Sequence, residues 1–178
     1  MRISLKSLIA SLVLLSGATS FPAAAQDAAA NHLDVYKSPT CGCCTKWMDH
    51  LAENGFTSTG HHPDQLGEFK RELGIPVRYG SCHTGVSKDG YLFEGHVPAR
   101  YIQQFLANPP EDALGLTVPA MPVGSPGMEY KDQFMAYEVL LLRKDGSVEV
   151  YAAVESYEQQ FDTAPPLRKS LQTTQIVR

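Results

Sequence analysis

The chain has 178 residues, of which 43% are hydrophobic and 19% charged, a composition that suits one globular domain with a real core. Its 15 basic and 19 acidic residues give a net charge of −4, which argues against nucleic acid or an anionic membrane as a partner.

The first 25 residues predict a secretory signal peptide. Arg2 and Lys6 charge its start, residues 8–15 are apolar or small, and Ala23-Ala24-Ala25 offers a cleavage site. The apolar run is shorter than the roughly 20 residues that a bilayer-spanning helix needs. We therefore expect a mature chain that begins near residue 26, is exported to the periplasm and has no membrane partner.

Strands and helices alternate in the first half of the mature chain. Alternating apolar and polar residues predict strands, and apolar residues at helical spacing predict helices. These patterns give a strand at 32–37, a helix from Cys44 to Asn54-Gly55 capped by Ser38 or Thr40, a short strand at 56–61 and a helix at 65–73.

Two hairpins and a helix make up the second half. Lys-Asp-Gly turns predict one hairpin at 81–87 and 91–97 and another at 137–142 and 147–154, with a helix beginning near Pro98 between them. Residues 115–128 contain too much Gly and Pro for a regular element and are predicted to be a shaped loop.

The order of these elements predicts an α/β fold, because strands and helices alternate along the chain. The order itself, βαβαββα with an additional C-terminal β-hairpin, is that of a thioredoxin-like fold. We expect one such domain over residues 26–160, followed by a polar, flexible tail at 161–178.

The segment SPTCGCCTKW, residues 38–47, contains three of the four cysteines. Cys41 and Cys44 have the C-x-x-C spacing at the start of a helix, where the helix dipole and free N–H groups stabilise a thiolate. A thiolate serves both disulfide exchange and metal binding. Cys43 favours the metal, because an exchanger needs only two thiols and a Cys43–Cys44 bridge would be strained. A redox dithiol comes second, and paired structural disulfides in an exported protein come third.

Copper is the metal that these ligands favour. Structural zinc usually takes two separated pairs of ligands, whereas here three cysteines come from one turn and the fourth, Cys82, from a distant strand. The spacing is also too short for the usual iron–sulfur motifs. Clustered thiolates favour Cu(I) and can bridge several copper ions, so we expect copper rather than zinc.

Three further residues are candidate ligands. His83 follows Cys82, but in a regular strand the two side chains would point to opposite faces. Met121 and Met128 lie in the Gly/Pro-rich loop, where they either act as thioether ligands in a lid or pack in the core. The other rings near these motifs are predicted to lie outside the site: Trp47 in the core, His96 in a structural role, His61 and His62 in a solvated loop, and His50 without a role.

Four motifs in order, CGCCTKW, SCHTGV, YLFEGHVPARYI and GLTVPAMPVGSPGME, resemble the CopG-type copper-resistance proteins, long classified as a domain of unknown function. The resemblance covers about residues 33–154. It implies a thioredoxin-like fold, a periplasmic location, and copper bound by Cys41, Cys43, Cys44 and Cys82. It also implies a multinuclear, cysteine-bridged cluster that interconverts Cu(I) and Cu(II).

The predicted function is therefore periplasmic copper binding in copper resistance. Its expected partners are copper ions and other periplasmic copper-handling proteins. The alternative is a thiol–disulfide oxidoreductase that uses Cys41 and Cys44. The sequence leaves open whether the protein is an enzyme, because copper storage and copper oxidation would use the same ligands.

Overall fold

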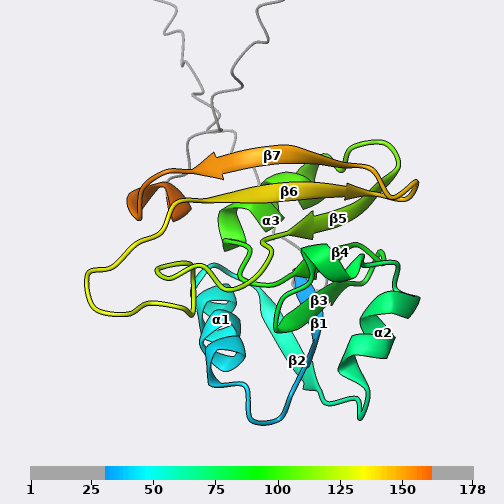
Figure 1. Ribbon diagram of the computed structural model, residues 1–178, viewed down its shortest axis with the longest axis horizontal. Coiled ribbons are helices and arrows are strands. Elements are labelled where there is room, and N and C mark those ends of the chain that lie inside the picture. Colours follow the sequence, from blue (N-terminus) through cyan, green and yellow to red (C-terminus); the bar gives the residue numbers. More distant parts are fainter. Residues whose placement is uncertain (1–30, 162–178) are drawn as a thin grey trace, which may run out of the picture.

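The computed structural model describes residues 31–161, so the predicted signal peptide and nearly all of the predicted tail lie outside the described residues. The described chain is a mixed α/β domain (Figure 1). Its elements are β1 (His32–Lys37), α1 (Gly42–Glu53), β2 (Thr57–His61), α2 (Leu66–Glu72), the 3-10 helix η1 (Val77–Tyr79), β3 (His83–Ser87), β4 (Leu92–Glu94), α3 (Ala99–Ala107), β5 (Ala113–Thr117), β6 (Tyr137–Arg143), β7 (Val148–Val154) and the 3-10 helix η2 (Glu158–Gln160).

All seven strands form one sheet, in the order β2-β1-β3-β4-β5-β6-β7. The β1–β2 and β4–β5 pairs are parallel, and the other neighbours are antiparallel. The predicted α/β class is confirmed, and the order from β1 to α3 follows the predicted βαβαββα order, while the thioredoxin-like assignment itself stays a prediction. Within residues 31–161, no helix is both long enough and apolar enough to cross a membrane.

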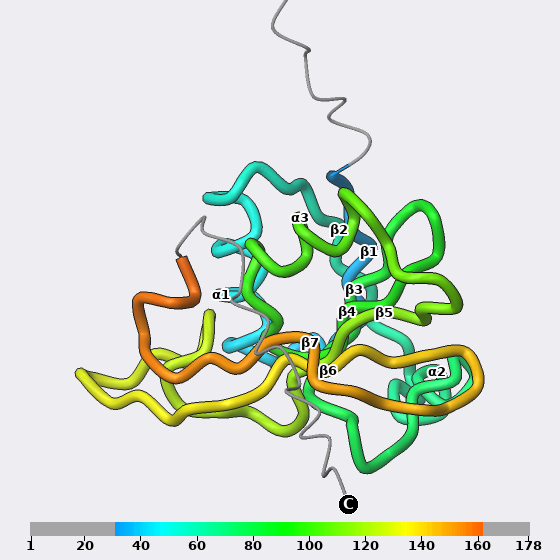
Figure 2. Tube along the Cα trace, turned by 90° about the horizontal axis from the view of Figure 1, so that it is seen from above, coloured from blue at the N-terminus to red at the C-terminus, as the bar shows by residue number. Residues whose placement is uncertain are grey.

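The helices cover both faces of the sheet (Figures 1 and 2). Adjacent residues of β4 point to opposite faces, as in any strand: Phe93 packs edge-on against Phe105 of α3, whereas Glu94 pairs with Lys70 of α2. Helix α1 lies on the α3 side. There Trp47 is fully buried and donates a hydrogen bond from its indole Nε1 to the Val97 carbonyl at 2.9 Å, as its predicted core position requires.

Two expectations about local structure were wrong. Residues 115–128 are not wholly a loop, because β5 extends to Thr117 between β4 and β6. Gly115 permits this close pairing, since a Cβ there would lie 1.8 Å from the Leu92 carbonyl oxygen. The strand joins the C-terminal hairpin to the main sheet.

The start of α1 also differs from the prediction. The helix begins at Gly42, and its cap is Cys41 rather than Ser38 or Thr40. The Cys41 Sγ accepts a hydrogen bond from the Cys44 N–H at 3.3 Å, so the sulfur takes the place that a hydroxyl or carboxylate oxygen usually fills. The first cysteine of the motif is thus part of the helix end itself.

Candidate metal centre

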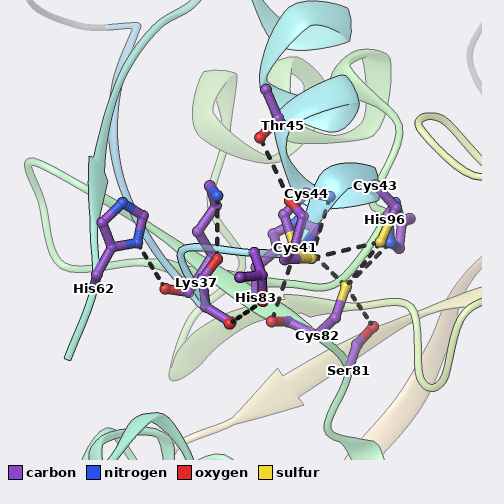
Figure 3. Close-up of a disulfide and its surroundings, with 12 residues drawn as sticks. Lys37, Cys41, Cys43, Cys44, Thr45, His62, Ser81, Cys82, His83 and His96 are labelled. Atoms are coloured by element: carbon purple, nitrogen blue, oxygen red, sulfur yellow. Dashed lines mark hydrogen bonds between the residues drawn. A yellow bond between two sulfur atoms is a disulfide. The ribbon is translucent and has the colours of Figure 1, made fainter. Parts of the chain in front are cut away.

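The four cysteines lie together where the first turn of α1 meets the segment that enters β3 (Figure 3). Cys41 and Cys44 form a disulfide, and Cys43 and Cys82 are free thiols. The Cys43 Sγ lies 3.5 Å from the Cys41 Sγ and 4.0 Å from the Cys82 Sγ. All four sulfurs are within 4.8 Å of one another, so one metal ion or one small cluster could reach every one of them once the Cys41–Cys44 disulfide is reduced.

The backbone at Cys82 is not part of a strand, because β3 begins only at His83. This removes the geometric objection to having both side chains on one side. The Cys82 Sγ lies 3.3 Å from His83 Nδ1, and the His83 ring in turn lies 4.3 Å, centroid to centroid, from the Trp47 ring. His83 Nε2 is buried without a hydrogen-bond partner, so this ring keeps a free nitrogen inside the protein.

His96 belongs to the same cluster, contrary to the prediction that it only supports the loop. Its Nε2 lies 3.2 Å from the Cys82 Sγ, and its Nδ1 is 2.7 Å from the Pro126 carbonyl oxygen. Since a carbonyl only accepts hydrogen bonds, Nδ1 carries the proton and the Nε2 lone pair faces the sulfur. Cys82, His83 and His96 therefore form a second possible ligand set that shares Cys82 with the first.

The hairpin register contained the signal for His96. Thr84 pairs with Glu94 across β3 and β4, so Cys82 falls opposite His96 when the register is continued by two residues. The Gly95 N–H donates to the His83 carbonyl at 2.9 Å, which extends the pairing past the end of β4. The Lys-Asp-Gly turn, recognisable in the sequence, fixes this register.

Burial controls the protonation of these groups. It raises the pKa of the Cys82 thiol to about 11, with the neighbouring Cys43 adding to the effect. It lowers the pKa of His83 well below its usual value and also lowers the pKa of His96. At neutral pH Cys82 is therefore a thiol and both imidazoles are neutral, so a thiolate-bound metal cation would displace a proton from Cys82.

A buried ion pair holds the segment that carries Cys82. Lys70 Nζ lies 2.6 Å from Glu94 Oε1, and the two side chains are 9% and 0% exposed. Glu94 also accepts hydrogen bonds from the Ser81 N–H at 2.6 Å and from the Thr84 hydroxyl, while Lys70 donates to the Ser81 carbonyl at 2.8 Å. The pair thus fixes the backbone on both sides of Ser81, directly before Cys82, and sequence reasoning missed it.

The Gly/Pro-rich loop is attached to the site at three points. The Ser81 hydroxyl donates to the Ala120 carbonyl, and His96 donates to Pro126. Gly127 (φ +86°) packs so tightly on α1 that a Cβ would lie 2.7 Å from the Cys43 carbonyl oxygen. Two of these attachment points are followed directly in the chain by a methionine: Met121 (50% exposed) follows Ala120, and Met128 (half-buried) follows Gly127. Ligation of a metal by either methionine stays a prediction.

The other histidines lie outside this cluster. His61 is the last residue of β2 rather than part of a loop, and it contacts Asp34 at 2.7 Å. His62, which follows the strand, contacts the Lys37 carbonyl at 3.0 Å. His50 is not a surface residue without a role: it is buried, and its Nε2 accepts a hydrogen bond from the Ala99 N–H at the start of α3. Its position ties α1 to α3.

A cluster of four cysteines and two histidines on an α/β domain defines a protein with a soft-metal or thiol-redox site. The family described as protein of unknown function, DUF411, matches residues 79–128. The chain is similar to the solved structure titled copper resistance protein copG, Form 1, at 44% identity, 70% of this chain, 98% of that chain and a TM-score of 0.66. For Form 2 the values are 45%, 69%, 97% and 0.65. Among curated proteins nothing matches.

This chain belongs to the CopG copper-resistance protein family. The similarity covers almost the whole length of the solved relatives. It confirms the family resemblance that the four sequence motifs indicate.

Proposed function

We propose that this protein binds copper as Cu(I) through Cys41, Cys43, Cys44 and Cys82 once the Cys41–Cys44 disulfide is reduced. The observation that carries the proposal is the approach of four sulfurs to within 4.8 Å of one another in a family named for copper resistance. Thiolates are soft ligands and select Cu(I). Zinc is the weaker candidate, because structural zinc sites rarely draw three ligands from one turn.

The close spacing of the sulfurs favours bridging. Sulfurs 3.5 to 4.0 Å apart cannot each hold a separate, fully ligated ion without sharing neighbours. A thiolate can bridge two cuprous ions, so we propose a multinuclear cluster. His96 Nε2 and His83 Nδ1, both within 3.3 Å of the Cys82 Sγ, would add nitrogen ligands on one side. Met121 and Met128 would add thioethers from the loop.

The biological setting that we propose is export to the periplasm, copper resistance, and exchange of copper with other copper-handling proteins there. The signal-like N-terminus and the family name support it. Interconversion of Cu(I) and Cu(II) at the cluster belongs to the same proposal.

A second candidate function, thiol–disulfide exchange, is favoured by one observation. Cys41 and Cys44 form a disulfide at a helix N-terminus, with Cys41 half-buried and Cys44 fully buried. This resembles the exposed and shielded sulfurs of an exchange enzyme. Cys43, only 3.5 Å from Cys41, is the thiol that such an enzyme would not need.

The test is anaerobic Cu(I) loading of the reduced mature chain, followed by gel filtration and measurement of copper per chain. We expect more than one copper per wild-type chain in the presence of an equimolar Cu(I) chelator, and a loss of at least half of it in Cys43→Ser or Cys82→Ser. His61→Ala, a histidine outside the cluster, is the control and should load like wild type.

Two results would overturn the proposal. One is preferential retention of zinc when both metals are offered to the reduced chain. The other is the absence of bound copper together with disulfide-reductase activity on insulin that persists in Cys43→Ser, which would establish the exchange function instead.

A further inference from the structure

The sulfurs of the site fall into two sets with different chemistry. Cys41 and Cys44 are joined to each other, whereas Cys43 and Cys82 remain thiols 4.0 Å apart. His96 Nε2 lies 3.2 Å from the Cys82 Sγ, and its Nδ1 donates to the Pro126 carbonyl, so neither contact of this ring involves Cys41 or Cys44. Oxidising the first set therefore leaves a smaller ligand set, Cys43, Cys82 and His96, directly beside it (Figure 3).

We propose that the Cys41–Cys44 dithiol is the electron donor that reduces Cu(II) to Cu(I) at this site, and that Cys43, Cys82 and His96 hold cuprous ion afterwards. The inference rests on the proposed copper function and adds to it the direction of the redox step and the source of the electrons.

The step balances as a two-electron reaction. The two S–H bonds of Cys41 and Cys44 break, one S–S bond forms between their sulfurs, and the two protons pass to solvent. The two electrons reduce two cupric ions to two cuprous ions. No further oxidant or reductant enters; a second round would require a dithiol reductant to restore the pair.

The geometry selects Cys41 and Cys44 for the oxidation. Their Cα atoms are 5.4 Å apart, within the range that a disulfide requires, and their bond is already formed in the structure. The competing pairs are not bonded in the structure: the Cys43 Sγ lies 3.5 Å from the Cys41 Sγ and 4.0 Å from the Cys82 Sγ. A bridge between the adjacent Cys43 and Cys44 would be strained.

The direction of electron flow follows from the ligands. Cupric ion is a stronger oxidant than a protein disulfide, and soft thiolates stabilise the cuprous product. Cys41 and Cys43 are half-buried, so an ion from solvent reaches this edge of the site, whereas Cys44 is fully buried behind it. The oxidised pair is thus shielded on the side of Cys44.

The experiment adds two equivalents of cupric sulfate to the fully reduced, reductant-free mature chain under anaerobic conditions. Three quantities are measured: the Cu(II) electron paramagnetic resonance signal, Cu(I) captured by a colorimetric chelator, and remaining thiols. We expect the Cu(II) signal to disappear, two Cu(I) per chain to form, and two of the four thiols to be lost.

Peptide mapping identifies which thiols are lost. Trypsin cuts after Lys37 and Lys46 and after Arg78 and Lys88, so Cys82 falls on a different peptide from the other three cysteines. After alkylation, the predicted product is residues 38–46 with an internal disulfide and one alkyl group, on Cys43. A Cys43–Cys82 disulfide would instead link the two peptides.

Cys41→Ser and Cys44→Ser test the pair. Serine is a good helix cap, so Cys41→Ser keeps the start of α1, and unchanged thermal unfolding relative to a reduced wild-type chain would verify this. Both variants should reduce less than a tenth of the Cu(II) that wild type reduces in the first minute, while His61→Ala should match wild type.

Either of two results would overturn the inference: undiminished Cu(II) reduction in both serine variants, or a linked 38–46/79–88 peptide as the main product. If the chain still loads Cu(I) but reduces no Cu(II), the redox inference fails and the copper-binding function stands. If it neither loads Cu(I) nor reduces Cu(II), both fail.

Discussion

The buried Lys70–Glu94 pair gives the sharpest stability prediction, because both charges lie away from water and removing one leaves the other unpaired. Glu94 is fully buried and accepts hydrogen bonds from Lys70, from the Ser81 N–H and from the Thr84 hydroxyl. The substitution Glu94→Gln leaves the volume almost unchanged but leaves the Lys70 ammonium without a counter-charge. Breaking a buried pair in this way costs about 3–5 kcal/mol of the free energy of unfolding.

For a domain of this size, such a loss corresponds to a fall in Tm of about 6–20 °C. The assay is thermal and urea unfolding of the chain from residue 26 onward at pH 7.5 without reductant, so that the Cys41–Cys44 disulfide is the same in every variant. Glu149→Gln is the matched control. It breaks the Arg143–Glu149 pair, which has the same 2.6 Å N–O distance but is 30% and 57% exposed, and it should cost less than about 1 kcal/mol.

A double variant separates lost charge compensation from lost packing. Lys70→Met combined with Glu94→Gln removes both charges while the Gln amide oxygen still accepts from the Ser81 N–H. It should be more stable than Glu94→Gln alone. If Glu94→Gln destabilises the protein no more than Glu149→Gln does, or if the double variant is less stable than Glu94→Gln, the buried charge pair does not provide this stability.

Three further predictions concern the contacts around α1. Gly127→Ala should lower the free energy of unfolding by about 2 kcal/mol or more, because its φ of +86° and the clash with the α1 backbone add together. The control Gly146→Ala, with φ +82° but open space around it, should lower it by about 1 kcal/mol. Urea midpoints measure both losses, and equal losses would contradict the close packing of Gly127. Burial lowers the pKa of His50 to about 4 from the usual 6.5, so neutral His50 stabilises the fold fully above pH 6.5. As the pH falls from 6.5 to 4, about 3 kcal/mol of the free energy of unfolding is lost. His50→Gln should flatten this part of the stability–pH curve, and an unchanged slope would count against the assignment. Trp47 is the single tryptophan, and its ring lies 4.3 Å from the His83 ring. Copper loading should therefore quench its fluorescence in proportion to the bound copper, as measured by a titration with excitation at 295 nm. Loading without quenching would place the metal elsewhere.

The secondary structure and the cysteine motif of this protein were predictable from local sequence patterns. The Lys-Asp-Gly turns, the alternating strands and the apolar helix faces each depend on residues close in the chain, and every helix and strand so predicted is present in the structure. The crowding of Cys41, Cys43 and Cys44 is likewise a property of one turn, and with the other motifs it identified the family. The prediction of a loop over 115–128 rested on local Gly and Pro content. It was wrong for Gly115–Thr117, because strand pairing with β4 and β6 outweighs that local signal.

The remaining features depend on which elements meet in space. That Cys82 reaches Cys43, that His96 faces Cys82, and that Lys70 and Glu94 fix the segment between them are results of sheet register and of the packing of α1 and α2 on opposite faces. The structure also places the disulfide between Cys41 and Cys44 and leaves Cys43 a free thiol. The sequence by itself thus determined the kind of ligand and the family. The tertiary structure decided which ligands share one site, because distances between residues 14 to 39 positions apart are fixed only by strand pairing and packing.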